Sequence, residues 1–333
     1  MKAFGALNSS IDSIHEFESP DPVVAPDEII VKVRAVSLNP VDTKVRKMIG
    51  ADDLSTPRIL GFDAAGIVER VGGHVKNFSI GDEVFYSGDV TRPGSNAELQ
   101  AIQAALVAKK PENFSFHQAA ALPLVSLTAW ELLFERMTDG NIPAGTPLLI
   151  INGAGGVGSA LIPLAKSAGL TVVATASREA SREWCLKLGA DHVIDHKSPL
   201  RQQAEALGFG EFPLIANLHD TEQYWEQTSD LLAPLGSLGL IVETKNPLDI
   251  GNPLRLKSPR IAWEYMPTRS RFQTPDMHRQ GEILAEIAKR CDQGTFPKLS
   301  ITAPEELTAE NLRAAHRQLE SASTIGKITM GLR

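Results

Sequence analysis

Residues 148–166, LLIINGAGGVGSALIPLAK, constrain the fold more strongly than any other stretch of the chain. An apolar run typical of a buried strand precedes three glycines at G-x-G-x-x-G spacing, and a helical pattern follows them. In this context the spacing predicts a tight turn whose backbone amides and helix N-terminus bind the pyrophosphate of a dinucleotide. The alternative is a glycine-rich turn without a ligand. The residues expected to contact the cofactor are Gly153, Ala154, Gly155, Gly156, Val157 and Gly158.

Two patterns of secondary structure divide the chain. From residue 148 to 242, strand-like runs alternate with helical runs, which predicts a parallel sheet with helical crossovers. Before residue 115, short strand-like runs are separated by Gly and Pro, which favours an antiparallel barrel. These runs cover residues 28–38, 64–72 and 82–86. Near the C-terminus, residues 277–294 and 309–321 read as amphipathic helices, and a strand-like piece follows residue 326.

The strand after the glycine turn indicates which dinucleotide is bound. NAD sites place an Asp or Glu at the end of this strand, where it holds the ribose 2′-hydroxyl. Here TVVATA is followed by Ser177 and Arg178, and Arg182 comes shortly after. A hydroxyl and two guanidinium groups suit a 2′-phosphate, so NADPH is the expected cofactor. The alternative is that both arginines belong to a solvated helix start.

Composition limits the classes of function. With 333 residues, two domains are expected, and a formal net charge of -7 argues against a nucleic-acid partner. The N-terminus lacks the apolar core of a signal peptide, and no apolar run is long enough to span a bilayer. Two cysteines, Cys185 and Cys291, are too few for a disulfide framework, so a cytoplasmic location is expected.

Residues 61–84, GFDAAGIVERVGGHVKNFSIGDEV, resemble the G-H-E-x-x-G-x-V signature region of medium-chain dehydrogenases/reductases. The matching positions are Gly61, Gly66, Val68, Gly72, Val75, Gly81, Asp82 and Val84. The resemblance implies an α/β protein with a GroES-like β-barrel catalytic domain, residues 1–122 and 295–333, and a Rossmann doubly wound parallel sheet that binds NADPH, residues 123–294. It also implies a homodimer, formed through the edge of the nucleotide-binding sheet.

The sequence departs from the zinc alcohol dehydrogenases of that family. Their catalytic metal is held by a Cys, the His of G-H-E and a second Cys, and these places correspond here to Asn39, Phe62 and about Leu124. An amide and two hydrocarbon side chains cannot bind Zn²⁺ as thiolate and imidazole do. The four-cysteine structural lobe is missing as well. No metal site is therefore expected.

Without these zinc ligands, the sequence is similar to the zinc-free quinone oxidoreductase branch of the family. Residues 39–46, NPVDTKVR, resemble the branch's N-x-x-D-T-Y-x-R motif, with Lys44 where Tyr is usual. The resemblance implies that Thr128, in ALPLVSLTAW, lies near the nicotinamide and that His196 lies beside the adenosine phosphate. Residues 259–277 resemble a subgroup called zinc-type alcohol dehydrogenase-like proteins.

Three side chains are candidates for the catalytic site. Asn39 could donate its amide to the substrate oxygen or to the cofactor ribose, or could serve only as a turn amide before Pro40. Asp42 fits a helix start, where a carboxylate is favoured, and Lys44 could simply face solvent.

The expected function is reduction of a small electrophile, a quinone or an α,β-unsaturated carbonyl, by NADPH. Two alternatives stay open: an alcohol dehydrogenase or ketone reductase, and a cofactor-binding protein with little turnover.

Overall fold

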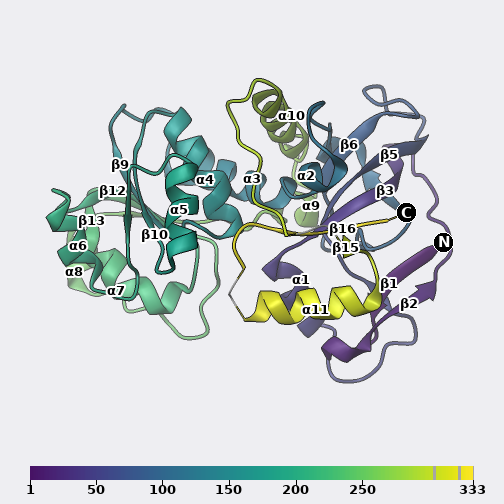
Figure 1. The fold of residues 1–333 in the computed structure, drawn as a ribbon, viewed down its shortest axis with the longest axis horizontal. Coiled ribbons are helices and arrows are strands. Elements are labelled where there is room, and N and C mark those ends of the chain that lie inside the picture. The colour runs from purple at the N-terminus through teal and green to yellow at the C-terminus, as the bar shows by residue number, and fades with distance from the viewer. Residues whose placement is uncertain (303–304, 322–323, 333) are drawn as a thin grey trace. The chain divides into compact units, whose positions relative to one another are not determined.

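The computed structural model describes residues 1–302, 305–321 and 324–332, and the chain divides into two compact units (Figure 1). The first unit combines Met1–Leu127 with Pro267–Arg333, and the second unit is Thr128–Met266. Both chain ends thus contribute to one unit, and the other is inserted between them, in the order expected from the sequence. Residues 267–294 lie in the first unit, whereas the sequence analysis assigned them to the nucleotide-binding domain. The two compact units are defined by contacts within the chain, so the expected domain boundaries themselves stay a prediction.

Strands dominate the first unit. Seven strands form one sheet in the order β15-β16-β3-β5-β6-β8, with β7 also paired to β3, and β2-β1-β4 form a second, smaller sheet. The pairs of β3 with β5, β7 and β16 are all antiparallel, as the alternating pattern predicts. The strands are β1 (Lys2–Ala6), β2 (Ile14–Glu18), β3 (Glu28–Leu38), β4 (Arg58–Ile59), β5 (Asp63–Val71), β6 (Glu83–Ser87), β7 (Leu99–Gln103), β8 (Val107–Lys109), β15 (Glu305–Glu306) and β16 (Ile328–Gly331).

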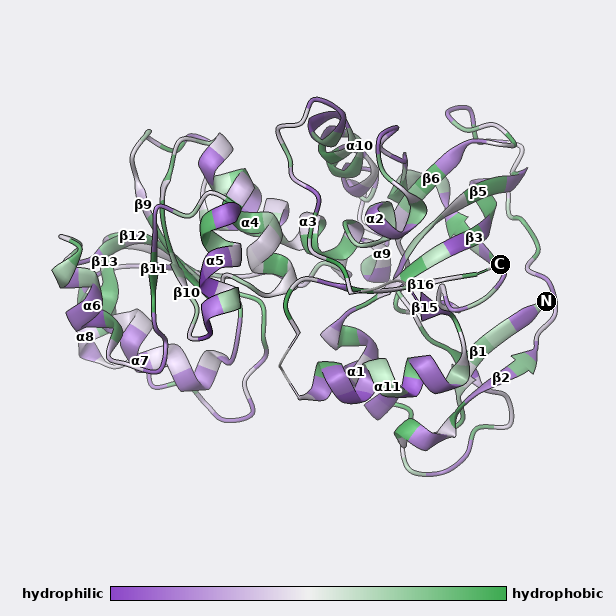
Figure 2. Cartoon of the chain, viewed as in Figure 1, coloured by the Kyte–Doolittle hydropathy of each residue, from purple (hydrophilic) through white to green (hydrophobic). Residues whose placement is uncertain are grey.

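Short helices connect these strands, and two longer ones come from the C-terminal part of the chain. The helices are α1 (Pro40–Lys47), α2 (Phe116–Ala120), α9 (Thr268–Phe272), α10 (Arg279–Asp292) and α11 (Ala309–Glu320). Both α10 and α11 were predicted from their periodicity, and Figure 2 shows hydrophilic and hydrophobic residues alternating along them. Their apolar positions are buried, among them Ile283 and Ile287 of α10 and Leu312 of α11.

The second unit is a six-stranded sheet in the order β11-β10-β9-β12-β13-β14, and every neighbouring pair is parallel. This confirms the predicted α/β class with a doubly wound parallel sheet. The strands are β9 (Pro147–Ile151), β10 (Thr171–Thr175), β11 (His192–Ile194), β12 (Phe212–Asn217), β13 (Leu232–Leu240) and β14 (Arg260–Trp263). Figure 2 shows that these strands are largely hydrophobic, because helices cover them.

The helices of the second unit follow its strands in turn. They are α4 (Gly156–Ser167), α5 (Glu179–Lys187), α6 (Leu200–Ala206), α7 (Thr221–Leu231) and α8 (Asn252–Leu256). The boundary between the units falls within α3 (Pro123–Trp130), which continues into a π-helical segment, Glu131–Met137. Within the part of the chain that the structure describes, no helix is both long and apolar enough to cross a membrane.

Candidate functional site

The glycine turn lies between β9 and α4, at the carboxyl end of the parallel sheet. The left-handed residue of this turn is Asn152, with φ 67°, so Gly153 is not needed for its backbone angle. Close packing explains the glycines instead: a Cβ on Gly153 would lie 2.8 Å from the Ala174 Cβ. A Cβ on Gly158 would lie only 2.4 Å from the backbone oxygen of Gly153. The third glycine therefore lets α4 begin directly against the turn.

The first turn of α4 can bind an anion. Gly155 is its N-cap, and Gly156, Val157 and Gly158 are its first residues, whose amides have no acceptor within a helix. No acidic side chain lies in this first turn. Together with Ala154, which is buried in the turn, these residues form the surface that the sequence assigned to a pyrophosphate. The residues present fit a dinucleotide.

The carboxyl ends of β10 and β11 hold the residues expected at the ribose. β10 ends at Thr175, and Ser177 and Arg178 follow, with Arg178 as the N-cap of α5. Arg182 donates from Nη2 to the Val193 oxygen at 3.0 Å, which fixes its guanidinium group against the end of β11. The structure thus places Ser177, Arg178 and Arg182 at the carboxyl ends of β10 and β11.

His196 follows β11 at the same edge, and two of the groups that influence it, Lys197 and His219, were not among the expected cofactor residues. Its pKa is lowered, chiefly by burial, with further contributions from the charges of His219, Lys197 and Arg178; Asp195 opposes them. Lys197 is the next residue, whereas His219 follows β12 and reaches this edge only because β12 belongs to the same parallel sheet. Thr128, the other expected cofactor residue, is buried in α3.

A separate group of polar side chains is buried in the first unit around Asp63, the first residue of β5. Its Oδ1 accepts from the Leu124 amide at 2.8 Å, and its Oδ2 accepts from Asn39 Nδ2 at 2.8 Å and from Lys327 Nζ at 3.0 Å. The Lys327 ammonium also donates to Asn39 Oδ1. Asn39, Asp63 and Lys327 are each at most 3% exposed, and we call these three residues the Asp63 cluster.

The Asp63 cluster fixes the orientation of the expected catalytic residue Asn39. Its amide oxygen is taken by Lys327, and one of its two amide hydrogens is directed to Asp63. One N–H of Asn39 then remains for another acceptor. Sequence reasoning identified Asn39 but missed Asp63 and Lys327; Asp63 stands where the G-H-E signature has its acid, which could have pointed to it.

Asp42 and Lys44 lie on α1, the helix that begins after Asn39. Asp42 Oδ2 accepts from the Asn39 backbone N at 2.7 Å, so Asp42 serves the helix start as expected. Its Oδ1 is buried and has no hydrogen-bond partner among the described residues. Lys44 is partly buried, and its backbone oxygen accepts a hydrogen bond from the Met48 N–H at the end of the helix.

Burial raises the pKa of Asp42 to about 7; the Asn39 backbone N–H opposes this shift, Asp63 adds to it and Lys327 reduces it. An unfolded Asp titrates near pH ~3.9, so the native state binds more protons than the unfolded state between about pH 4 and about pH 7. The free energy of unfolding is therefore expected to fall as the pH rises through this window, by up to about 1.4 kcal/mol per pH unit. Asp42→Asn is expected to flatten this dependence in urea titrations.

The matched control is Asp27→Asn, whose carboxylate is 79% exposed and lies in the same unit. It is expected to keep the slope of the wild type. Equal slopes for Asp42→Asn and the wild type would show that Asp42 ionises in the folded protein as it does in the unfolded chain.

The resemblance to zinc alcohol dehydrogenases implies a metal position beside Asn39, and the residues present do not fit zinc. Phe62 and Leu124 supply no donor atom from their side chains, and Asn39 already binds an ammonium group through its oxygen. In the described ranges, no three or more His, Cys, Asp or Glu residues are grouped so that they could hold a metal ion. An ammonium group that contacts Asn39 and Asp63 would also repel a divalent cation. Of these three positions, only Asn39 belongs to the Asp63 cluster, where its side chain is engaged with a buried ion pair.

A parallel sheet with a glycine turn at its carboxyl end, inserted into a unit of antiparallel strands, defines a nicotinamide-dinucleotide-dependent oxidoreductase of two domains. Family models agree: the alcohol dehydrogenase GroES-like domain matches residues 25–112, and the zinc-binding dehydrogenase family matches residues 188–329. A zinc-type alcohol dehydrogenase-like protein of Staphylococcus aureus strain COL is 42% identical over 99% of this chain and 98% of its own length. The chain belongs to the medium-chain dehydrogenase/reductase superfamily.

Two further relatives carry the names of specific activities. The chloroplastic NADPH-dependent alkenal/one oxidoreductase of Arabidopsis thaliana is 42% identical over 53% of this chain and 46% of its own length. The crystal structure of Escherichia coli quinone oxidoreductase complexed with NADPH superimposes with a TM-score of 0.83 at 25% identity. That comparison covers 99% of this chain and all of the bacterial enzyme.

Proposed function

We propose that the protein is an NADPH-dependent reductase of quinones or α,β-unsaturated carbonyl compounds that works without zinc. The observation that carries the proposal is the Asp63 cluster: Asn39, at one of the family's three zinc-ligand positions, is engaged with Asp63 and Lys327. Two relatives support it, since one is named for alkenals and enones and the other for quinones.

The chemistry of the acceptor follows from the missing metal ligands. Reduction of a plain ketone needs polarisation of the carbonyl oxygen, and zinc supplies this in the metal-dependent members of such families. In an enone or a quinone, hydride addition spreads the negative charge over a conjugated system that ends on oxygen. Hydrogen-bond donors can stabilise that charge without a metal ion. A conjugated acceptor therefore suits this site better than an isolated carbonyl group does.

The chain's own residues would bind, orient and protonate the acceptor. We assign the remaining Nδ2–H of Asn39 to the acceptor oxygen, since Asp63 and Lys327 hold the amide in one orientation. Asp42, whose pKa lies near 7, can carry a proton at neutral pH. Lys44 stands where the branch has a tyrosine, and its ammonium group can donate to the same oxygen. Bound NADPH supplies the hydride.

The second unit favours NADPH over NADH. No carboxylate ends β10, and Arg178 and Lys197 bring positive charge to the ends of β10 and β11. A ribose 2′-phosphate would find charge-assisted donors there, with Ser177 as a further hydroxyl. Arg182 is already bound to the Val193 oxygen, so it also holds the loop in place.

Arg178→Ala is expected to raise KM for NADPH by about tenfold and to leave KM for NADH unchanged, because a charged hydrogen bond contributes about 1.5–3 kcal/mol. Steady-state kinetics with both cofactors and one acceptor measures the change. Arg255→Ala, an exposed arginine of α8 in the same unit, is the matched control and is expected to change neither value. Parallel losses for NADPH and NADH would remove Arg178 from the phosphate site.

A panel of acceptors tests the proposed function directly. With NADPH, we expect oxidation in the presence of quinones and short enones, little with the corresponding saturated ketones, and full activity after treatment with a chelator. Preference for ketones or secondary alcohols that a chelator abolishes would support an alcohol dehydrogenase. NADPH binding without turnover of any acceptor would support a cofactor-binding protein.

We further propose that two copies pair through β14, the edge strand of the second unit's sheet. An edge strand leaves one row of backbone donors and acceptors unpaired, and Trp263 on it is 46% exposed. Sedimentation at micromolar concentration is expected to give a dimer, and a monomer at all concentrations would contradict the pairing.

A further inference from the structure

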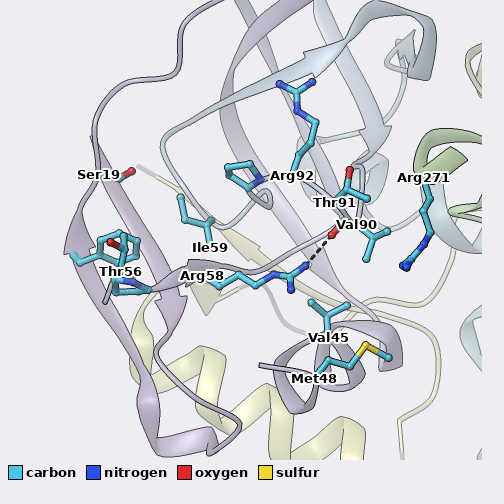
Figure 3. Close-up of a pocket in the computed structure, with 13 residues that line it drawn as sticks. Ser19, Val45, Met48, Thr56, Arg58, Ile59, Val90, Thr91, Arg92 and Arg271 are labelled. Atoms are coloured by element: carbon cyan, nitrogen blue, oxygen red, sulfur yellow. Dashed lines mark hydrogen bonds between the residues drawn. The ribbon is translucent and has the colours of Figure 1, made fainter. Parts of the chain in front are cut away.

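A pocket in the first unit is lined by none of the three residues of the Asp63 cluster. It has a cavity volume of about 630 Å³, within the range of small-molecule sites. Its walls come from β4, the end of α1, the loop after β6 and α9 (Figure 3). α1 contributes Val45 and Met48, which follow Asn39 by six and nine residues along the chain.

The lining of this pocket combines an apolar wall with positive charge only. Its apolar side chains are Phe17, Val45, Met48, Pro57, Ile59, Val90 and Pro93. Its charged residues are Arg58, Arg92 and Arg271, and no Asp or Glu is among the described residues that line it.

The three arginines differ in how their charge is balanced. Arg92 forms an ion pair with Glu28, and Figure 3 shows its guanidinium group pointing away from the centre of the pocket. Arg58 donates from Nη2 to the Val90 backbone oxygen at 2.8 Å and has no ion pair within the described part of the chain. Arg271 is exposed and, within the same described residues, also has no ion pair; it lies over the Phe272 ring.

The unbalanced guanidinium groups define the ligand. Arg58 and Arg271 extend from opposite sides toward the part of the pocket beside Val90 (Figure 3). A partly buried guanidinium without a counter-ion has lost hydration without a compensating charge, and its planar donors match a carboxylate. The carboxylate nearest along the chain, Asp89, accepts from the Thr91 N and Oγ1 at 2.8 Å instead.

We propose that this pocket binds a small carboxylate with an apolar chain, whose carboxylate pairs with Arg58 and whose chain packs on Val45, Met48 and Ile59. Two sources share this chemistry. One is an acidic tail on the acceptor itself, and the other is a separate carboxylate that regulates the protein. The binding does not depend on the proposed reductase activity.

Calorimetric titration with octanoate, and with octanamide as the uncharged probe of equal length, tests the proposal. Wild-type protein is expected to bind octanoate more tightly than octanamide. Arg58→Gln is expected to weaken octanoate binding by about tenfold or more and to leave octanamide binding unchanged, because one charge-assisted pair is lost. Arg70→Gln, a surface arginine of β5 outside the pocket, is the matched control and should bind as the wild type does.

Two outcomes would overturn the proposal: equal affinity of the wild type for the two probes, or unchanged octanoate affinity in Arg58→Gln. If Arg58→Gln does not fold, the exposed Arg271→Gln takes its place, with an expected loss of about threefold. Octanoate that competes with the acceptor assigns the pocket to an acceptor tail, and octanoate that binds alongside the acceptor assigns it to a separate ligand. Because calorimetry requires no turnover, an inactive protein would still decide the question.

Discussion

Lys327→Met is expected to lower the free energy of unfolding of the first unit by about 3–5 kcal/mol, because it leaves Asp63 as an uncompensated buried charge. Asp63 would keep its bonds to the Leu124 amide and to Asn39 Nδ2, but both donors are uncharged. Asn39 would lose the partner of its amide oxygen and, with it, its fixed orientation. We therefore expect a lower kcat with conjugated acceptors as well, with little change in NADPH affinity. Urea denaturation and acceptor kinetics measure the two effects.

Two further variants separate charge from packing. Lys327→Met combined with Asp63→Asn is expected to recover part of the stability, because the buried charge is then removed from both sides. Lys109→Met breaks an ion pair with Asp82 in the same unit, but the Lys109 side chain is 65% exposed, so the expected loss is below about 1 kcal/mol. Similar losses of unfolding free energy for Lys327→Met and Lys109→Met would show that the Asp63 cluster stabilises the first unit no more than an exposed ion pair does.

Gly158→Ala is expected to destabilise the second unit by about 3 kcal/mol and to reduce NADPH affinity at least tenfold, since overpacking against backbone atoms cannot be relieved by a rotamer change. The new Cβ would lie 2.4 Å from the Gly153 oxygen and 2.6 Å from the Asn152 oxygen. The helix would have to move away from the turn, and the amides of its first residues would move with it. Thermal unfolding and calorimetric titration with NADPH report the two losses separately.

Gly210→Ala is the matched substitution, since a Cβ there would meet nothing within 4 Å. It is expected to change stability by no more than about 0.5 kcal/mol and NADPH affinity not at all. Normal NADPH binding by Gly158→Ala would mean that α4 need not begin so close to the turn.

The second unit could be predicted well because its signals are local. The alternation predicted over residues 148–242 is found there, and β9, the turn and α4 follow one another within 21 residues along the chain. The turn itself was predicted from the glycine spacing, but the structure gives a different reason for the first of the three glycines. Asn152, rather than Gly153, takes the left-handed conformation, and the first glycine is required by its contact with Ala174 and Cys185.

The Asp63 cluster could not be predicted in the same way. Lys327 and Asp63 are separated by 264 residues, and no periodicity or spacing links two positions so far apart. The pairing exists because β16 aligns with β3, and β3 aligns with β5, in the antiparallel sheet. The sequence identified Asn39 as a candidate but could not show that both ends of its amide are engaged. His219 was missed for a similar reason, because it follows β12 and comes 23 residues after His196 in the sequence.

The pairing of β16 with β3 sets the order in which the chain can fold on the ribosome. Ile328 lies opposite Leu38, so β3 leaves the ribosome about 290 residues before its partner, which corresponds to roughly 15–60 s of translation. The second unit, in contrast, is complete once residue 266 has emerged. Residues 35–38 of β3 and the carboxylate of Asp63 therefore stay without these partners until residues 327–331 have been made. A nascent chain stalled shortly before residue 327 is expected to contain a folded second unit beside an unfinished, chaperone-dependent first unit.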